Sequence, residues 1–335
     1  MGMSLSIRQK NILLSIVEIY IKTKKPVSSE DVLENSDVKA SSATVRNDMQ
    51  KLQHLKYIYQ QHASGGRIPT DEALKMYFEI IDEVFSRKEA FIDLPKNYKF
   101  YDLNHMFENI SKMISSLLNG LVIFEYPDPK YIYITRAVVT PLTEYAFVVS
   151  FMTNLGMTIS RTVDSYGLPK AKELEMMLNS GLTGKSLQEI FLGVKNQYFQ
   201  TDDIRVSNMM ELIKGLLDEF ARKKYIVYGL EKIISSTKPS LECIESLTML
   251  IENDGIKNEI FKGLEYSTDI KLFFGNDINS KSLKNLGFFY SSYCKDSHTI
   301  GRILFIGDKF NEYEKIYKVL KEYNSRFSEI ISKNL

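Results

Sequence analysis

The sequence predicts a multidomain α+β protein whose first 70 residues form three helices and a β-hairpin. Three observations predict this class. Apolar residues recur at helical spacing near the N-terminus, β-prone runs occupy 131–163 and return after 269, and helical patterns fill much of 170–253. With 335 residues, of which 44% are hydrophobic, the chain can bury two or three cores without disulfides.

Capping patterns define the first two predicted helices. Ser6 followed by Gln9 makes a capping box. The apolar residues that follow at helical spacing are Leu13, Ile16, Val17, Tyr20 and Ile21. Pro26 closes the connection, and Ser28 with Asp31 caps a short second helix.

A third helix is predicted from a cap at Ser41 or Ser42 to about His54. Val45, Met49 and Leu52 fall in one narrow stripe, which is expected to be the buried side. The opposite side carries amides, which read base edges, and is flanked by cations, which hold phosphates. These residues are Ala43, Asn47, Gln50 and His54, with Arg46 and Lys51 beside them.

A hairpin is predicted directly after this helix. Residues 57–61 are β-prone, and Ser64, Gly65 and Gly66 supply a turn that returns Arg67 alongside them. A guanidinium at this place suits a phosphate or a narrow minor groove. Three helices followed by a hairpin predict a winged helix-turn-helix, a unit that binds DNA in many proteins and serves as a protein-interaction module in others.

Charge favours the DNA-binding alternative. Residues 1–70 contain ten Lys and Arg against six Asp and Glu, a net charge of +4, while the whole chain has +1. Phosphate attraction acts over about a Debye length, so this local excess matters more than the total. The residues predicted to contact DNA are Ser42, Ala43, Thr44, Arg46, Asn47, Gln50, Lys51, His54, His62, Ser64 and Arg67.

The remaining elements are predicted from periodicity. A helix opens at Thr70, Asp71 and Glu72 and closes near Arg87 and Lys88, and the polar stretch 93–99 is a linker candidate. Further helices are predicted at 103–119, 170–178, 186–198, 209–222, 242–253 and 312–331, and strands at 131–139, 145–152, 156–163, 271–274, 286–294 and 301–306. Helices inserted into an antiparallel-sheet domain explain this order.

The sequence resembles the heat-inducible transcription repressors called HrcA. Residues 41–49 are close to the family's SSATIRNDM, residues 61–70 are close to its QPHTSAGRIPT, and weaker similarity extends over essentially the whole chain. Three departures stand out. Gly65 replaces an alanine, Lys56 replaces a glycine before the wing, and 307–313 replaces a segment of Gly-Pro-Thr-Arg-Met-Asp-Tyr type.

The resemblance implies an organisation and a function. It implies a winged-helix domain with a connecting helix at 1–88, a GAF-like domain at 100–167 and 263–335, and a mainly helical dimerising insertion at 168–262. It also implies a repressor of groE/dnaK-type chaperone operons that binds an inverted-repeat operator and depends on the GroEL chaperonin. Independently, a homodimer is expected because one winged helix reads only a short stretch of DNA.

Other function classes have less support. The alternative is a winged-helix regulator that senses a small ligand through the GAF-like domain. An enzyme is not expected, because no nucleophile motif, metal-ligand spacing or convincing carboxylate pair is visible. The four scattered histidines and the distant Cys243 and Cys294 predict no metal or cofactor. Residues 181–186 resemble the end of a P-loop but follow a helical pattern, which disfavours nucleotide binding.

Localisation is predicted from the absence of membrane and export patterns. No run of eighteen or more apolar residues occurs, and the first ten residues lack the apolar stretch of a signal peptide. A cytoplasmic protein without a membrane partner is therefore expected.

Overall fold

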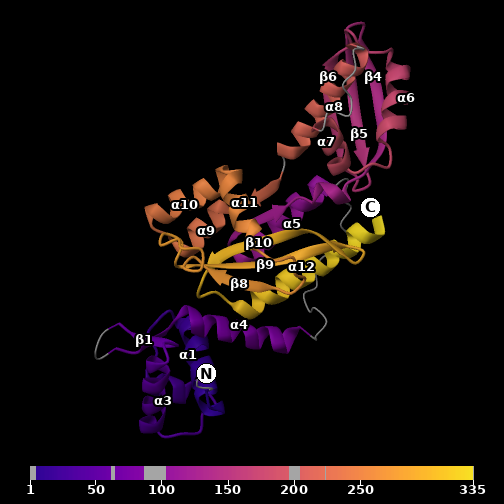
Figure 1. Ribbon diagram of the computed structural model, residues 1–335. Helices are drawn as coiled ribbons and strands as arrows, with labels where there is room; N and C mark the ends of the chain where they lie inside the picture. The colour runs from indigo at the N-terminus through magenta and orange to yellow at the C-terminus, as the bar shows by residue number, and fades with distance from the viewer. Residues whose placement is uncertain (1–4, 62–64, 87–102, 196–203, 223, 335) are drawn as a thin grey trace.

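A computed structural model describes residues 5–61, 65–86, 103–195, 204–222 and 224–334 (Figure 1). Helices α1 (Ile7–Thr23), α2 (Ser29–Glu34) and α3 (Ser42–His54) pack together at the N-terminus, followed by the hairpin of β1 (Ile58–Gln60) and β2 (Arg67–Pro69). This is the predicted winged helix-turn-helix. No helix of the described ranges is long and apolar enough to cross a membrane.

The predicted N-caps are confirmed. The Ser6 hydroxyl accepts from the Gln9 N–H at 3.2 Å, and the Gln9 side chain accepts from the Ser6 N–H at 3.0 Å. Ser28 and Asp31 make the same reciprocal pair at the start of α2. Ser41 caps α3 through the N–H of Thr44 at 3.2 Å. Short-range polar contacts therefore fix where each helix begins.

The wing is attached to the loop between α1 and α2 by its backbone. Val27 and Arg67 exchange two backbone hydrogen bonds, at 2.7 and 2.9 Å, which adds a bridge beside β2. A Cβ at Gly66 would lie 2.5 Å from the carbonyl carbon of Pro26 and 2.7 Å from the nitrogen of Val27. This close approach explains why glycine stands at this position of the turn.

Helix α4 (Asp71–Phe85) joins the winged helix to the rest of the chain. It packs against helix α12 (Tyr313–Asn334) and strand β8 (Lys271–Phe274). The buried ring of Phe78 lies 5.7 Å from Phe289, 6.2 Å from Tyr313 and 6.0 Å from Tyr317. The apolar face of α4 is thus buried, as predicted. The end that the sequence predicts for this helix, at Arg87 and Lys88, lies outside the described residues.

The central sheet has five antiparallel strands in the order β7-β3-β10-β9-β8. The strands β3, β7, β9 and β10 are Leu121–Glu125, Tyr225–Tyr228, Leu286–Lys295 and His298–Asp308. Helices α5 (Leu103–Leu118) and α12 cover one face, and α9 (Leu230–Thr237), α10 (Leu241–Glu252) and α11 (Asp254–Lys262) cover the other. Alternate residues of β3 enter the two cores, so the described part of this unit is a three-layer sandwich.

A second, three-stranded sheet stands apart from the first, in the order β4-β5-β6 (Figure 1). Its strands are Ile134–Thr143, Ala146–Thr153 and Thr158–Asp164, preceded by the short helix η1 (Pro129–Tyr131). Helix α6 (Ala171–Leu182) packs against β4, and α8 (Ile204–Arg222) packs against β6. Helix α7 (Leu187–Lys195) contacts η1 and α8. The chain leaves the central sheet after β3 and returns beside it at β7, where Val122 pairs with Tyr228.

The prediction that strands 131–163 share a sheet with the late strands is wrong. They pair only among themselves in the described part of the chain, and the late strands pair with β3 and β7 instead. Residues 230–262, expected in the insertion, form α9, α10 and α11 and pack on the central sheet; of these helices only α10 was predicted, at 242–253. Strands β3 and β7 were not predicted, because five and four residues give too short a pattern to separate from neighbouring helices.

Residues 181–186 and the two cysteines, which the sequence disfavours as functional sites, are part of the packed structure. Residues 181–186 begin in the last turn of helix α6, so a helix and not a strand precedes them, as predicted. Gly184 turns the chain at φ +82° before Ser186, which exchanges capping hydrogen bonds with Glu189. Cys243 is buried and Cys294 half-buried, and both are free thiols. Burial raises the pKa of each thiol, which favours its protonated form.

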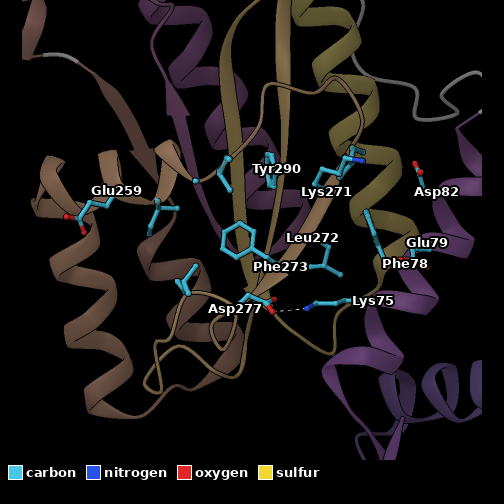
Figure 2. A pocket seen from close by; sticks show the side chains of 15 residues that line it. Lys75, Phe78, Glu79, Asp82, Glu259, Lys271, Leu272, Phe273, Asp277 and Tyr290 are labelled. Atoms are coloured by element: carbon cyan, nitrogen blue, oxygen red, sulfur yellow. Dashed lines mark hydrogen bonds and ion pairs between the residues drawn. The ribbon is translucent and has the colours of Figure 1, made fainter. Parts of the chain in front are cut away.

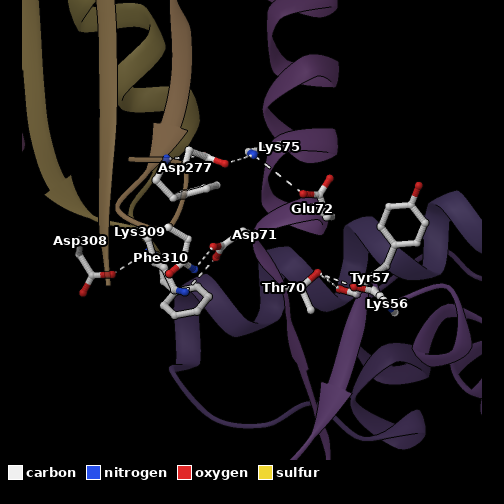
Figure 3. A network of polar contacts seen from close by, with 12 residues as sticks. Lys56, Tyr57, Thr70, Asp71, Glu72, Lys75, Asp277, Asp308, Lys309 and Phe310 are labelled. Atoms are coloured by element: carbon white, nitrogen blue, oxygen red, sulfur yellow. Dashed lines mark hydrogen bonds and ion pairs between the residues drawn. The ribbon is translucent and has the colours of Figure 1, made fainter. Parts of the chain in front are cut away.

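The divergent segment 307–313 contacts the winged helix (Figure 3). The Lys309 ammonium lies 3.0 Å from the Asp71 carboxylate, and that carboxylate also accepts from the Asn276 amide at 2.6 Å. The Phe310 ring packs edge-on against Tyr20, with ring centroids 4.7 Å apart. The segment therefore helps to hold α1 and α4 against the central sheet.

Replacing Phe78 with alanine is expected to lower the free energy of unfolding by about 3–5 kcal/mol, because the aromatic cluster would lose a buried ring and keep a cavity. Urea unfolding measures the change. The control Val84→Ala removes a more exposed side chain of the same helix and should cost less than about 0.5 kcal/mol. Equal losses in the two variants would contradict the packing of α4 described above.

Candidate nucleic-acid interface

Helix α3 presents one polar face to solvent. Val45, Met49 and Leu52 are buried, as predicted, against the other helices of the unit. The exposed residues on the remaining surface include Ala43, Arg46, Asn47, Gln50, Lys51 and His54. Six of the predicted contact residues are therefore brought together on one accessible helix surface.

Ser42 and Thr44 are only half-buried, and their hydroxyls already have partners. The Ser42 hydroxyl donates to a Glu30 carboxylate oxygen at 3.3 Å, and Thr44 shares a hydrogen bond with Ser41 at 2.9 Å. Both residues lie at the start of α3. Their first role is to order that turn, and a contact with a ligand would have to share these groups.

Arg67 lies at the loop end of the hairpin, where it pairs with Gln60. Its Nη1 donates to the Gly65 carbonyl at 3.2 Å, but its buried Nε has no hydrogen-bond partner in the described residues. Burial and then the nearby charge of Arg46 lower the pKa of Arg67. Arg46 of α3 and Arg67 of β2 therefore contribute positive charge to the same side of the unit. His62 and Ser64 lie outside the described residues.

Asp48, a buried acid of α3, was not among the residues predicted from the sequence. The Arg8 Nε donates to it at 2.7 Å and the Gln9 amide at 3.3 Å, both from the first turn of α1. The hydrogen bond and the charge of Asp48 raise the pKa of Arg8. A carboxylate beside the apolar stripe was the available signal, because buried charges need partners.

The turn from α3 to the wing has a left-handed residue at Lys56, with φ +64°. Glycine adopts this conformation without the Cβ penalty that a lysine carries. The Thr70 hydroxyl can donate its hydrogen bond to either of two carbonyl oxygens, that of Lys56 at 2.8 Å or that of Tyr57 at 2.9 Å (Figure 3). This contact ties the turn to the start of α4.

An exposed recognition helix next to a basic wing defines a winged-helix DNA-binding protein. Comparison with known families gives the particular one. Residues 4–80 match the family described as "Winged helix-turn-helix transcription repressor, HrcA DNA-binding", and residues 104–317 match "HrcA protein C terminal domain". The chain belongs to the HrcA family of heat-inducible transcription repressors, which are not enzymes.

Relatives match over nearly the whole chain. The heat-inducible transcription repressor HrcA of Thermotoga petrophila is 31% identical over 325 residues, which cover 96% of this chain and 93% of that protein. The HrcA of Lactobacillus acidophilus is 26% identical, with 96% of each chain covered. A crystal structure of a hypothetical protein, 28% identical, superposes with a TM-score of 0.72 over 98% of this chain and 99% of that chain.

Replacing Lys56 with glycine is expected to raise the free energy of unfolding by about 0.5–1 kcal/mol, because the left-handed conformation no longer carries a Cβ. Urea unfolding measures the gain. Lys56→Ala is the matched control, since it removes the same charge but keeps the Cβ. A similar stability in both variants would show that the backbone at this turn is not strained.

Proposed function

We propose that this protein represses groE/dnaK-type chaperone operons by binding an inverted-repeat operator as a dimer. The observation that supports this most is the surface of α3, where Arg46, Asn47 and Gln50 are exposed above a fully buried apolar stripe. A helix with this division enters the major groove with its polar face toward the bases.

The chemistry of this surface assigns separate roles. Asn47 and Gln50 carry amides that pair in bidentate fashion with adenine, and Arg46 carries a guanidinium that pairs with guanine. We assign Lys51 and Arg67 to phosphates, with Arg67 in the hairpin. Small Ala43 lets the backbone approach the groove. The remaining proposed contacts are His54, Ser42 and Thr44, together with His62 and Ser64, which lie between β1 and β2 in the sequence.

We infer three functional units. The winged helix with α4 spans 1–88, the central sheet forms the GAF-like domain, and the excursion between β3 and β7 forms the dimerising insertion. Exposed apolar side chains on α6 and α7, namely Met176, Phe191 and Leu192, support the last assignment. Two-fold pairing of winged helices would match the symmetry of an inverted repeat.

We further propose that activity depends on the GroEL chaperonin. Strand β3 pairs with β7, about a hundred residues later in the chain, and with β10, about 180 residues later. Such non-local pairing makes folding slow and exposes apolar surface. The folded fraction of the repressor would then follow chaperonin supply in the cytoplasm, and repression would lapse when unfolded proteins occupy the chaperonin.

A small-ligand sensor is the second candidate, and one hollow supports it. This hollow of about 600 Å³ lies between α4, α11 and the edge of the central sheet. Figure 2 shows Lys75 and Phe78 on one side, Glu259 on the other, and Phe273 with Tyr290 between them. A ligand there would touch the helix that carries the winged helix.

One experiment separates these functions. The purified protein is titrated with a palindromic chaperone-operon operator and with a scrambled duplex, with and without chaperonin. Selective binding that chaperonin strengthens supports the proposal. Selective binding that is indifferent to chaperonin favours the ligand sensor, and equal binding of both duplexes contradicts operator recognition.

Replacing Asn47 with alanine is expected to weaken operator binding by about 1–3 kcal/mol, because a bidentate base contact is lost, with little effect on unrelated DNA. Fluorescence anisotropy on the two duplexes measures the difference. The control Gln188→Ala removes an exposed amide of α7 and should change neither affinity. Equal losses on both duplexes would reduce Asn47 to a contact without sequence preference.

Replacing Arg67 with alanine is expected to lower the affinity for both duplexes and to flatten the plot of log affinity against log salt by about one unit, because one phosphate contact disappears. Titrations at several salt concentrations give the slope. Lys172→Ala removes an exposed cation of α6 and serves as the control. An unchanged slope in the Arg67 variant would place the wing away from the DNA backbone.

A further inference from the structure

The recognition helix carries a single acidic residue, Asp48, and its side chain is 2% exposed. Two groups of α1 approach it, the Arg8 guanidinium at 2.7 Å and the Gln9 amide at 3.3 Å. Arg8 contacts Oδ2 of this carboxylate. The ammonium of Lys51, one turn further along α3, lies 4.0 Å from Oδ1, and the Lys51 side chain is 65% exposed. The carboxylate therefore has one close cation and one distant cation.

We propose that Arg8 is a positioning residue for DNA recognition. By neutralising Asp48 it fixes the start of α1 on α3 and leaves the Lys51 ammonium free for a phosphate. The inference rests on the proposed operator binding, to which it adds a residue outside the recognition helix and the wing.

The physical argument concerns what Asp48 would do without Arg8. A carboxylate buried to this degree is costly unless an opposite charge compensates it. Lys51 is the other cation within 4.0 Å in the described residues, so it would turn inward to take the place of Arg8. The proposed interface would lose a phosphate contact and gain an acid near the phosphates, although Arg8 itself touches no DNA.

A direct role for Arg8 makes a different prediction. Its side chain is 52% exposed, so the alternative role is that of a phosphate ligand at the start of α1. The two roles differ in their response to Asp48. A phosphate contact is lost with Arg8 whatever stands at position 48, whereas a positioning role is needed only while position 48 carries a charge.

Four variants test the proposal by operator titration: Arg8→Ala, Asp48→Asn, the double variant with both changes, and Lys22→Ala at the exposed far end of α1 as control. Arg8→Ala should bind the operator roughly tenfold more weakly, the size of effect expected for one lost phosphate contact. Asp48→Asn should bind within about twofold of the unchanged protein, since an amide there needs no cation. The double variant should recover the affinity of Asp48→Asn.

Two further readouts remove ambiguity. Urea unfolding of each variant checks that Arg8→Ala still folds, and Arg8→Lys keeps the charge and should retain most of the affinity. If the double variant stays as weak as Arg8→Ala, Arg8 is a phosphate ligand and the positioning role is overturned. If Arg8→Ala binds like the unchanged protein, the inference also fails, whereas loss of operator selectivity in the unchanged protein would overturn the proposed function itself.

Discussion

The architecture depends on helix α4 being buried from two sides. It contacts α1 of the winged helix and, through Phe78, the aromatic cluster of β9 and α12. The buried side chains of α1, α4, α5 and α12 consequently belong to one continuous core, which is separate from the core under α9, α10 and α11. Strand β2 ends at Pro69 and α4 begins at Asp71, so only Thr70 separates the hairpin from α4. The packing of α4 on the central sheet therefore also sets the orientation of α3.

Apolar burial dominates this arrangement, and polar contacts orient it. One buried aromatic or aliphatic side chain contributes about 1.5–3 kcal/mol, whereas a partly exposed ion pair contributes about 0–1 kcal/mol. The pairs of Lys309 with Asp71 and of Lys75 with Asp277 are of the second kind (Figure 3). These ion pairs orient α4 more than they stabilise it, since both join the start of α4 to loops of the central sheet. The divergent 307–313 segment thus acts at the joint between the two units.

Local features were predictable from the sequence, and non-local ones were not. The caps at Ser6, Ser28 and Ser41 and the buried stripe of α3 involve residues three or four apart, so their patterns are visible in the sequence. The partners of β3 and the ion pair of Arg8 with Asp48 join residues 40 or more apart. Contacts between residues this far apart leave no periodic pattern in the sequence. For this reason the sheet assignment was wrong, and the ion pair of Arg8 with Asp48 was not predicted.

The most direct test of the account is amide hydrogen exchange of the protein with and without a palindromic operator. The account predicts that operator DNA slows exchange in the first turns of α3 and at Arg67, and that a scrambled duplex does so much less. Protection confined to the sheet of β4, β5 and β6, with α3 unchanged, would contradict it, because DNA would then meet a different surface.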